Sequence, residues 1–433
     1  MKKEVHYIGH EISQNRRTIG KDRIKAVLSI PKPLTKKQVL SFLGCTGYCR
    51  QWICNYAKLS QPLSDIAHAT TLTANDSVTW TSDATDSFEK LKEALASAPA
   101  LGIPDLSKDF SLAVDEKNGY YNAVLLQKHG DKLKPVAYYS QRLSAVVRGL
   151  PTCSRAVAAA ASAVTASASL VAYRPLTVFV PHAVAAILLQ AKMAHFTPAS
   201  TLHYYNILNL PHVTLRRCDV LNPATLLPTE EDGEPHDCLA AITEAVTPRQ
   251  DLATIPLSNS DLIYYVDGSA SRIDGVGAVG YAVVSDHDVV ESARLPSHLS
   301  AQAAELFALT RTCILSEGKS VTIYTDSRYA FGVVHDYGTL WKNRGFLTSQ
   351  GTPIQHHLLV NNLLDAILLP SQVAVCKCQA HVRVTDDVSK GNYLADSAAK
   401  SAAVSCETYS LQMPLDSAES QTVFDPHMSL KDI

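Results

Sequence analysis

The sequence predicts an α/β protein with a small helical unit followed by two units of similar order. Short apolar β-type runs alternate with helical stretches through residues 84–180, and the order of three strands, a helix and a strand returns after residue 261. The chain has 433 residues, of which 46% are hydrophobic and 18% charged. This composition is typical of a globular protein, and the length allows two or three domains.

The N-terminal region predicts a β-hairpin followed by three short helices. Residues 5–19 are the hairpin, with the polar turn at 14–17. The helices are expected over 21–29, from the Thr35 cap to Phe42, and over 56–67. Residues 1–60 carry 12 Lys or Arg against 3 Asp or Glu, whereas the whole chain has a net charge of −2. A basic end favours phosphate binding, with a merely solvated basic face as the alternative.

The middle region predicts the first α/β unit. A helix at 84–96 precedes strands near 110–114, 122–127 and 135–139, an Ala-rich helix, and a strand at 176–180. Residues 156–173 carry no charge over 18 positions, close to the lower length limit of a membrane span. Because Ala, Ser and Thr dominate this stretch, we predict a buried helix and no membrane partner.

The predicted domain boundaries follow from these patterns. An acidic, Pro- and Gly-containing segment begins at Thr229 and has a short helical stretch near 238–245. The C-terminal residues show no strong periodicity. The division is 1–76, helical unit; 77–228, first α/β unit; 229–260, acidic linker; 261–403, second α/β unit; 404–433, poorly structured tail.

The ten cysteines show no regular pairing, which suits a reducing compartment. Cys376 and Cys378 near His381, and the three cysteines at 45, 49 and 54, fit no standard zinc spacing. We therefore predict no structural zinc. No apolar run follows Met1, so we expect an intracellular protein, cytoplasmic or nuclear and not secreted.

Four acids in the C-terminal half have the settings of a metal site. Asp267 and Asp326 each end an apolar β-type run, Glu305 lies in a helical stretch, and Asp396 lies at the start of the last helix. Each acid alone is more often a turn or surface residue. Together, at strand ends that favour ligand sites, they predict an oxygen-rich site for Mg²⁺ or Mn²⁺. Two such ions are the usual means of cutting a phosphodiester.

The motifs around these acids resemble the ribonuclease H domain of a gammaretrovirus-type reverse transcriptase. They are Tyr265-Val266-Asp267-Gly268-Ser269, Ala304-Glu305-Leu306, Tyr324-Thr325-Asp326-Ser327-Arg328-Tyr329-Ala330 and Ala395-Asp396-Ser397-Ala398-Ala399-Lys400. Segments near 98–106, 114–117, 134–138 and 221–228 resemble the connection region of these enzymes, and 42–53 their thumb. The resemblance covers roughly residues 5–403. It implies two tandem ribonuclease H-like folds, each a mixed five-stranded sheet with helices, after a thumb-like unit.

The resemblance also implies roles for the acids. Asp267 would contact both metal ions, Asp396 would help to hold the ion that activates water, and Glu305 and Asp326 would hold the other. His381 matches a mobile histidine that moves a proton or assists product release, although Gln379-Ala380 stands where the family has Pro-Gly. In the first copy only Asp115 remains, because Ala156 and Pro181 take the other acid positions.

The same resemblance implies contacts with an RNA–DNA hybrid. Residues that match hybrid contacts of the family are Gln302, Arg328, Tyr329, Trp341, Lys342 and Arg344. A buried core tryptophan at a helix end is the alternative reading of Trp341. No Tyr-x-Asp-Asp motif occurs in these 433 residues, so we expect no polymerase activity. We predict a ribonuclease H without small-molecule cofactor, with a monomer favoured. The alternative is a weak or inactive nucleic-acid-binding remnant of an endogenous retroelement.

Overall fold

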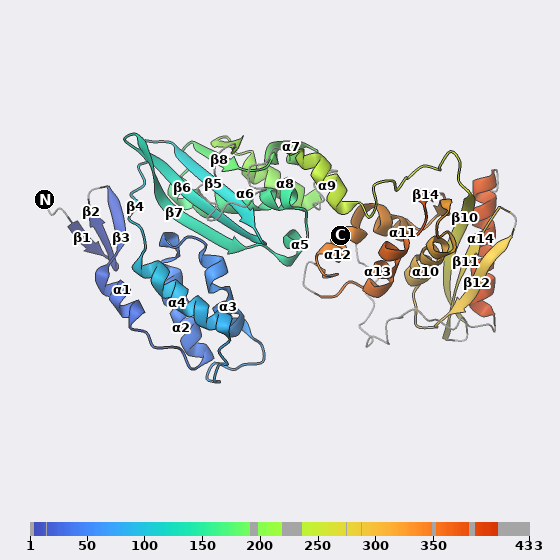
Figure 1. Cartoon of the computed structure of the whole chain (residues 1–433), viewed down its shortest axis with the longest axis horizontal. Helices are drawn as coiled ribbons and strands as arrows, with labels where there is room; N and C mark the ends of the chain where they lie inside the picture. The colour runs from blue at the N-terminus through green and yellow to red at the C-terminus, as the bar shows by residue number, and fades with distance from the viewer. Residues whose placement is uncertain are drawn as a thin grey trace. The chain divides into compact units, whose positions relative to one another are not determined.

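The computed structural model describes residues 4–13, 15–190, 198–218, 236–273, 275–286, 288–348, 352–380 and 386–405 (Figure 1). These residues form two compact units, Met1–Ile242 and Thr243–Ile433. Three sequence predictions lie outside the described residues: the motif at 221–228, the mobile histidine at His381, and most of the tail at 404–433. The start of the predicted linker lies outside them as well.

The N-terminal part contains a small sheet and a helical cluster. The strands are β1 (Glu4–Tyr7), β2 (His10–Ser13), β3 (Arg16–Ile19) and β4 (Leu101–Gly102), in the order β1-β2-β3-β4. The predicted hairpin thus has a further strand, because Gly9 at φ +74 allows a turn between β1 and β2. The helices are α1 (Lys21–Leu28), α2 (Lys36–Tyr48), a 3₁₀ turn at Arg50–Trp52, α3 (Tyr56–His68) and α4 (Ser82–Ala96).

Helix α4 belongs with this cluster and not with the sheet that follows. Its buried face includes Phe88 and Leu91, which share one hydrophobic core with Phe42 of α2 and Leu63 of α3. The helical unit therefore extends past residue 76, the predicted boundary. The amphipathic pattern of α4 is satisfied by the preceding helices, because they offer the apolar surface nearest in sequence.

The first large sheet has the strand order β7-β6-β5-β8-β9. Its strands are β5 (Phe110–Lys117), β6 (Tyr120–His129), β7 (Lys132–Arg142), β8 (Leu176–Val180) and β9 (Val213–Arg217). The helices are α5 (Ala145–Arg148), α6 (Thr152–Val171), α7 (Val184–Leu189), α8 (Pro198–Leu208) and α9 (Cys238–Val246). Among the described residues, α6 alone is long and apolar enough to cross a membrane, and its Ala-rich surface packs in the core of this sheet. The predicted buried helix is confirmed.

The second large sheet repeats the arrangement in the order β12-β11-β10-β13-β14. Its strands are β10 (Leu262–Ile273), β11 (Val276–Val284), β12 (Val289–Leu295), β13 (Ser320–Thr325) and β14 (Gln372–Lys377). The helices are α10 (Ala301–Leu315), α11 (Arg328–Gly332), a π-helical turn at Val333–Tyr337, α12 (Gly338–Asn343), α13 (His357–Ala366) and α14 (Asp387–Val404).

Helices α10 and α14 cover opposite faces of this sheet (Figure 1). Tyr264 and Val266 of β10 pack in the core that contains α10, whereas the intervening Tyr265 packs against Ala395 and Ala399 of α14. Alternation along one strand directs successive side chains to opposite faces. The predicted α/β class with two five-stranded mixed sheets of one topology is confirmed.

The predicted linker is divided between the two units. Cys238 and Ile242 of α9 are buried in the core of the first large sheet. Farther along, Arg249 donates hydrogen bonds to the carbonyl groups of Ile367, Pro370 and Ser371, which belong to the second unit. The acidic composition at the start of this segment predicted a linker. Helix α9 within it nevertheless packs in a core, because it carries apolar residues.

Candidate metal centre of the C-terminal unit

The two predicted aspartates lie where the parallel pairing of β10 and β13 ends. Strands β10 and β13 are parallel, and Val266 pairs with Thr325. Asp267 directly follows Val266 in the sequence, and Asp326 directly follows Thr325. Asp267 is only 7% exposed, since β10 continues past this point in its pairing with β11. The edge where parallel strands end is a common ligand site in α/β proteins.

Glu305 reaches this edge because the backbone of α10 touches β10. The helix begins after Ser300, whose side chain accepts a hydrogen bond from the backbone N–H of Ala303. Gly268 has no side chain at the point of contact. A Cβ atom there would overlap the backbone nitrogen of Glu305 and lie 2.5 Å from the carbonyl carbon of Ala304. Glycine at 268 thus permits the approach that brings Glu305 beside Asp267.

The three carboxylates form one group. Asp267, Glu305 and Asp326 each offer an oxygen within 4.8 Å of the other two. Oxygens bound to one Mg²⁺ at roughly 2.0–2.1 Å lie at most about 4.2 Å apart. Three carboxylate oxygens this close together can converge on one ion of that size.

Burial and mutual repulsion make this group costly in its ionised form. Burial, followed by the charges of Asp326 and Asp396, raises the pKa of Asp267 to about 6. Burial, followed by the charges of Asp267 and Asp326, raises the pKa of Glu305 to about 9. Among the described residues, the buried Oε2 atom of Glu305 finds no hydrogen-bond partner. A divalent cation would supply the missing partner and the opposite charge, so the donor set fits Mg²⁺ or Mn²⁺.

Asp396 lies near the group but is held by another partner. The Nζ atom of Lys400, one helical turn later on α14, donates to Asp396 Oδ2 at 2.8 Å. That bond raises the pKa of Lys400, and the charge of Asp396 contributes to the raised pKa of Asp267. The structure thus brings three of the predicted acids together and places the fourth in an ion pair beside them.

Two residues that the sequence analysis missed hold Asp326 in place. Asn392 of α14 donates from Nδ2 to Asp326 Oδ2 at 3.1 Å, and the thiol of Cys378 donates to Asn392 Oδ1 at 3.3 Å. Asn392 precedes Asp396 by four residues, so both lie on the same face of the helix. This four-residue spacing could have indicated from the sequence that Asn392 lies on the same side of the helix as Asp396.

The predicted hybrid-contact residues differ in exposure. Gln302 and Arg328 are exposed, whereas Trp341 is 9% exposed and packs against Tyr337 at 4.5 Å between ring centroids. Tyr329 is half-buried in the same aromatic cluster, with a ring-centroid distance of 6.4 Å to Trp341. The burial of Trp341 agrees with the alternative of a core tryptophan.

The basic residues beside Trp341 also have structural surroundings. Lys342 donates to Asp365 at 2.7 Å, and burial lowers the pKa of the Arg344 guanidinium. The hybrid contacts of Gln302, Arg328, Tyr329, Trp341, Lys342 and Arg344 remain predictions.

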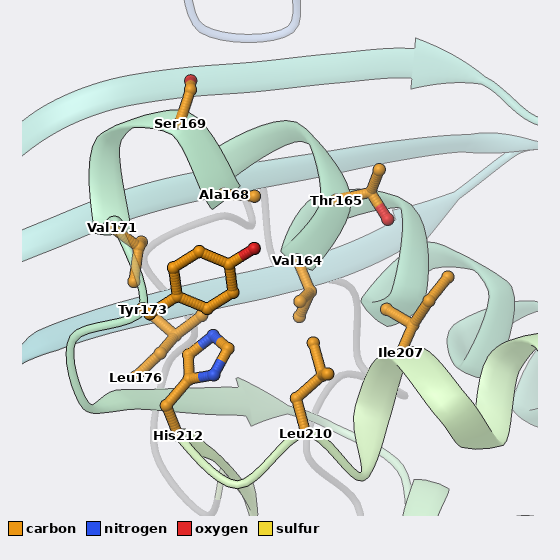
Figure 2. Close-up of a pocket in the computed structure, with 10 residues that line it drawn as sticks. All are labelled: Val164, Thr165, Ala168, Ser169, Val171, Tyr173, Leu176, Ile207, Leu210 and His212. Atoms are coloured by element: carbon orange, nitrogen blue, oxygen red, sulfur yellow. The ribbon is translucent and has the colours of Figure 1, made fainter.

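A separate pocket of about 480 Å³ lies in the first large-sheet unit, between α6 and α8 (Figure 2). Tyr173 and His212 meet edge to face at one side of it, with ring centroids 5.5 Å apart. Val164, Leu176 and Leu210 give it an apolar lining, and the lining residues that the structure describes include no Asp or Glu. This pocket therefore lacks the chemistry of the carboxylate group.

Two family models match separate parts of the chain. Residues 259–404 match the RNase H family model, and residues 80–178 match the model of the RNase H-like domain found in reverse transcriptase. The chain therefore contains an RNase H domain that follows an RNase H-like domain of the reverse-transcriptase type.

Over most of its length the chain is similar to retroviral Pol proteins. It is 41% identical over 408 residues to the Gag-Pol polyprotein of feline leukemia virus and 41% identical over 415 residues to the Pol polyprotein of feline endogenous virus ECE1. These alignments cover 94% and 95% of this chain but only 23% and 39% of the relatives. The predicted relation to the C-terminal region of gammaretroviral reverse transcriptase is confirmed.

The chain also aligns with the foamy viral protease–reverse transcriptase solved in complex with an RNA/DNA hybrid. That alignment covers 93% of this chain and 53% of the other, with 21% identity and a TM-score of 0.46. At this identity and TM-score, the structural alignment adds nothing to the family matches.

Proposed function

We propose that the chain is a metal-dependent endonuclease that hydrolyses the RNA strand of RNA–DNA hybrids. The observation that carries the proposal is the buried group of Asp267, Glu305 and Asp326 within a domain of the RNase H family. Burial and neighbouring charges raise the pKa of Asp267 and of Glu305, and one buried oxygen of Glu305 has no partner among the described residues. A cation site needs such features, and a purely structural cluster avoids them.

Asp267, Glu305 and Asp326 would hold Mg²⁺, with Mn²⁺ as a substitute, and we propose two ions in the working enzyme. When bound, the ions lower the pKa of an attacking water and neutralise charge at the phosphate. Asp396 would join the site by exchanging its Lys400 partner for the cation. Asn392 would position Asp326 through its amide hydrogen bond.

Strand choice would depend on Glu305. A carboxylate oxygen of Glu305 that accepts a hydrogen bond from a ribose 2′-OH selects RNA over DNA at the cut strand. Gln302 is exposed one turn before Glu305, and Arg328 is exposed beside Asp326, so both can contact the two strands. Cleavage should leave 5′-phosphate and 3′-OH ends. We also propose that the chain acts inside the cell, where thiols such as those of Cys45, Cys49 and Cys54 stay reduced.

A binding function without turnover is the second candidate. The ion pair of Lys400 with Asp396 favours it, because that contact competes with a cation for the fourth acid. In either case the chain should not extend a primer, since it carries no paired-aspartate palm motif in its 433 residues. Templated nucleotide addition by the purified chain would contradict this part of the proposal.

The test is cleavage of an end-labelled RNA–DNA hybrid by the purified chain in Mg²⁺ and in Mn²⁺. Asp267→Asn is the matched variant, because it keeps the side-chain shape and removes one ligand charge. Internal cuts confined to the RNA strand, dependent on metal and lost in Asp267→Asn, support the endonuclease. Hybrid binding without cuts in either metal would leave the second candidate standing.

A further inference from the structure

A second cluster of metal-binding side chains lies in the first unit, among residues that the proposed nuclease chemistry does not use. Cys153 is in the first turn of α6, and His182 follows β8 after one residue. Cys238 is the first residue of α9, and His236 precedes it by two residues. Each offers a sulfur or ring nitrogen within 4.8 Å of the others. All four belong to the compact unit Met1–Ile242.

Four of the six separations among the ligand atoms are close to the edges of a tetrahedron around zinc. The Nε2 atom of His236 lies 3.3 Å from Cys153 Sγ, 3.3 Å from His182 Nδ1 and 3.2 Å from Cys238 Sγ. Cys238 Sγ lies 3.8 Å from His182 Nδ1. With Zn–S near 2.3 Å and Zn–N near 2.0–2.1 Å, a tetrahedral site requires edges of roughly 3.3–3.8 Å.

Hydrogen bonding alone does not explain this convergence. A ring nitrogen carries one N–H or one lone pair, so His236 Nε2 can form a single good hydrogen bond. It nevertheless has three polar heavy atoms at 3.2–3.3 Å. A cation among the four atoms would accept a lone pair from each of them, which removes the conflict.

The surroundings suit a closed structural site. Cys153 is 5% exposed and Cys238 is 3% exposed. The backbone N–H of Ala183 donates to Cys238 Sγ at 3.4 Å, a contact that steadies a thiolate. Two sulfur and two nitrogen donors favour zinc over magnesium, in contrast to the all-oxygen group of Asp267, Glu305 and Asp326.

We propose that Cys153, His182, His236 and Cys238 bind one structural zinc ion. Binding would deprotonate both thiols, so each Zn²⁺ taken up by the thiol form releases two protons. The ion would join the N-terminal end of α6, the end of β8 and the start of α9. It thereby holds α9 in the core where Ile242 is buried. This reverses the expectation of no zinc, which was drawn from local cysteine spacings only.

The first experiment measures metal in the full-length chain. The chain is expressed with zinc in the medium, desalted, and analysed for metal content by mass spectrometry; one zinc per chain is expected. Replacement by Co²⁺ should give the visible absorption of a tetrahedral site and a sulfur-to-cobalt charge-transfer band. A chain that contains no zinc and gives no such spectrum would overturn the proposal without the use of any variant.

The second experiment assigns the ligands. Cys238→Ser and His182→Ala should lose the zinc and lower the Tm of the first unit, whereas His182→Cys should retain the metal with a stronger charge-transfer band. Cys45→Ser is the matched control, because Cys45 is an exposed free cysteine outside the cluster. Full zinc in Cys238→Ser and His182→Ala, or a Cys153–Cys238 disulfide in the native chain, would refute the assignment. Glu305→Gln should leave the zinc content unchanged.

Discussion

The two large sheets have one topology but different chemistry at the same edge. In the first, β5 and β8 are parallel neighbours; in the second, β10 and β13 hold the same positions. Asp115 and Asp267 occupy corresponding places on β5 and β10, and both are buried. Among the residues that the structure describes, a group of three carboxylates forms at that point in the second sheet only.

In the first sheet, residues without a carboxylate occupy the positions that correspond to Glu305 and Asp326. Pro181 follows β8 where Asp326 follows β13, and Ala156 is buried in α6. Next to it, Arg155 makes a 2.8 Å ion pair with Glu116, whose side chain is only 1% exposed. A buried carboxylate with a guanidinium partner has no need of a metal ion.

The difference shows that the fold does not require the acids. Both sheets keep their order, their parallel central pair and an apolar helix on one face, although only one retains the carboxylate group. This contrast supports the proposal that the carboxylates serve function in the second copy, because burying charges that repel one another does not favour folding. At the corresponding edge of the first copy, His182 belongs to the sulfur and nitrogen cluster.

The largest expected difference between the two copies comes from changing one aspartate to asparagine in each. Asp326→Asn should reduce cleavage of a hybrid by roughly 10²–10³-fold or more, because it removes one of three charges that hold the cation. Asp115→Asn, in the copy without the carboxylate group, should leave the rate unchanged. The measurement is the initial rate in Mg²⁺, with hybrid affinity measured separately. Cleavage that survives the first change, or is lost with the second, would mean that the active copy is the other one.

The next largest effect on cleavage and stability is expected for the variant Gly268→Ala. In Gly268→Ala the new Cβ must displace the backbone of α10 at Ala304 and Glu305, so both the site and the packing suffer. Overpacking of this kind costs about 1–3 kcal/mol, which lowers the Tm by roughly 2–10 °C. Calorimetry and a cleavage assay test both parts. Gly44→Ala is the control, since no atom lies within 4 Å of a Cβ there. Equal Tm values for the two variants would contradict the close contact.

Sequence reasoning predicted the elements best where the local signal was strong. The Thr35 cap predicted the start of α2, and the apolar run before Asp326 placed that acid at a strand end. Asp267 lies instead within β10, at the point where the pairing of β10 with β13 ends. The distances among the carboxylates were not predictable, because they depend on the contact of Gly268 with α10. That contact joins residues far apart in the sequence.

Long-range contacts also explain what was missed. Cys153, His182 and His236 are separated by tens of residues, so no local spacing marks the cluster. The ion pair of Asp396 with Lys400 was missed for a different reason, because it is a local contact. Its four-residue spacing was visible, but the motif suggested a metal ligand and not a lysine partner.

The raised pKa values of the second copy predict a specific pH dependence of stability. Folding raises the pKa of Asp267 from 3.8 to about 6 and that of Glu305 from 4.5 to about 9. The folded state thus holds these protons more tightly than the unfolded chain. Their stabilising contribution is present below about pH 4 and is lost as the pH rises towards 9.

In EDTA, Glu305→Gln should therefore raise the Tm relative to the unmodified chain, with a gain that grows between about pH 5 and pH 9. Mg²⁺ should reduce that gain, because the ion stabilises only the ionised site. Thermal unfolding at several pH values, with and without Mg²⁺, gives the result. Glu317→Gln, at an exposed glutamate, should show no such trend. A gain independent of pH would remove the electrostatic explanation.

The smallest effect concerns the basic N-terminal region, which lies in the unit without the carboxylates. Deleting residues 1–60 would expose the core that Phe42 shares with Phe88, so charge changes make the cleaner test. Arg17 and Lys36 already bond to carbonyl groups inside the protein, whereas Lys21, Lys25 and Lys37 are exposed. These three exposed lysines are available to contact phosphate.

Changing Lys21, Lys25 and Lys37 together to Glu should weaken hybrid binding and reduce the slope of log K against log [salt] by about one per lost phosphate contact, because fewer counterions are released. Cleavage at saturating hybrid should not change. The control is the same change at the exposed Lys128, Lys132 and Lys134, which alters the net charge equally at the β6–β7 turn. Equal slopes for the two triple variants would show that net charge, and not a basic binding surface, sets the affinity.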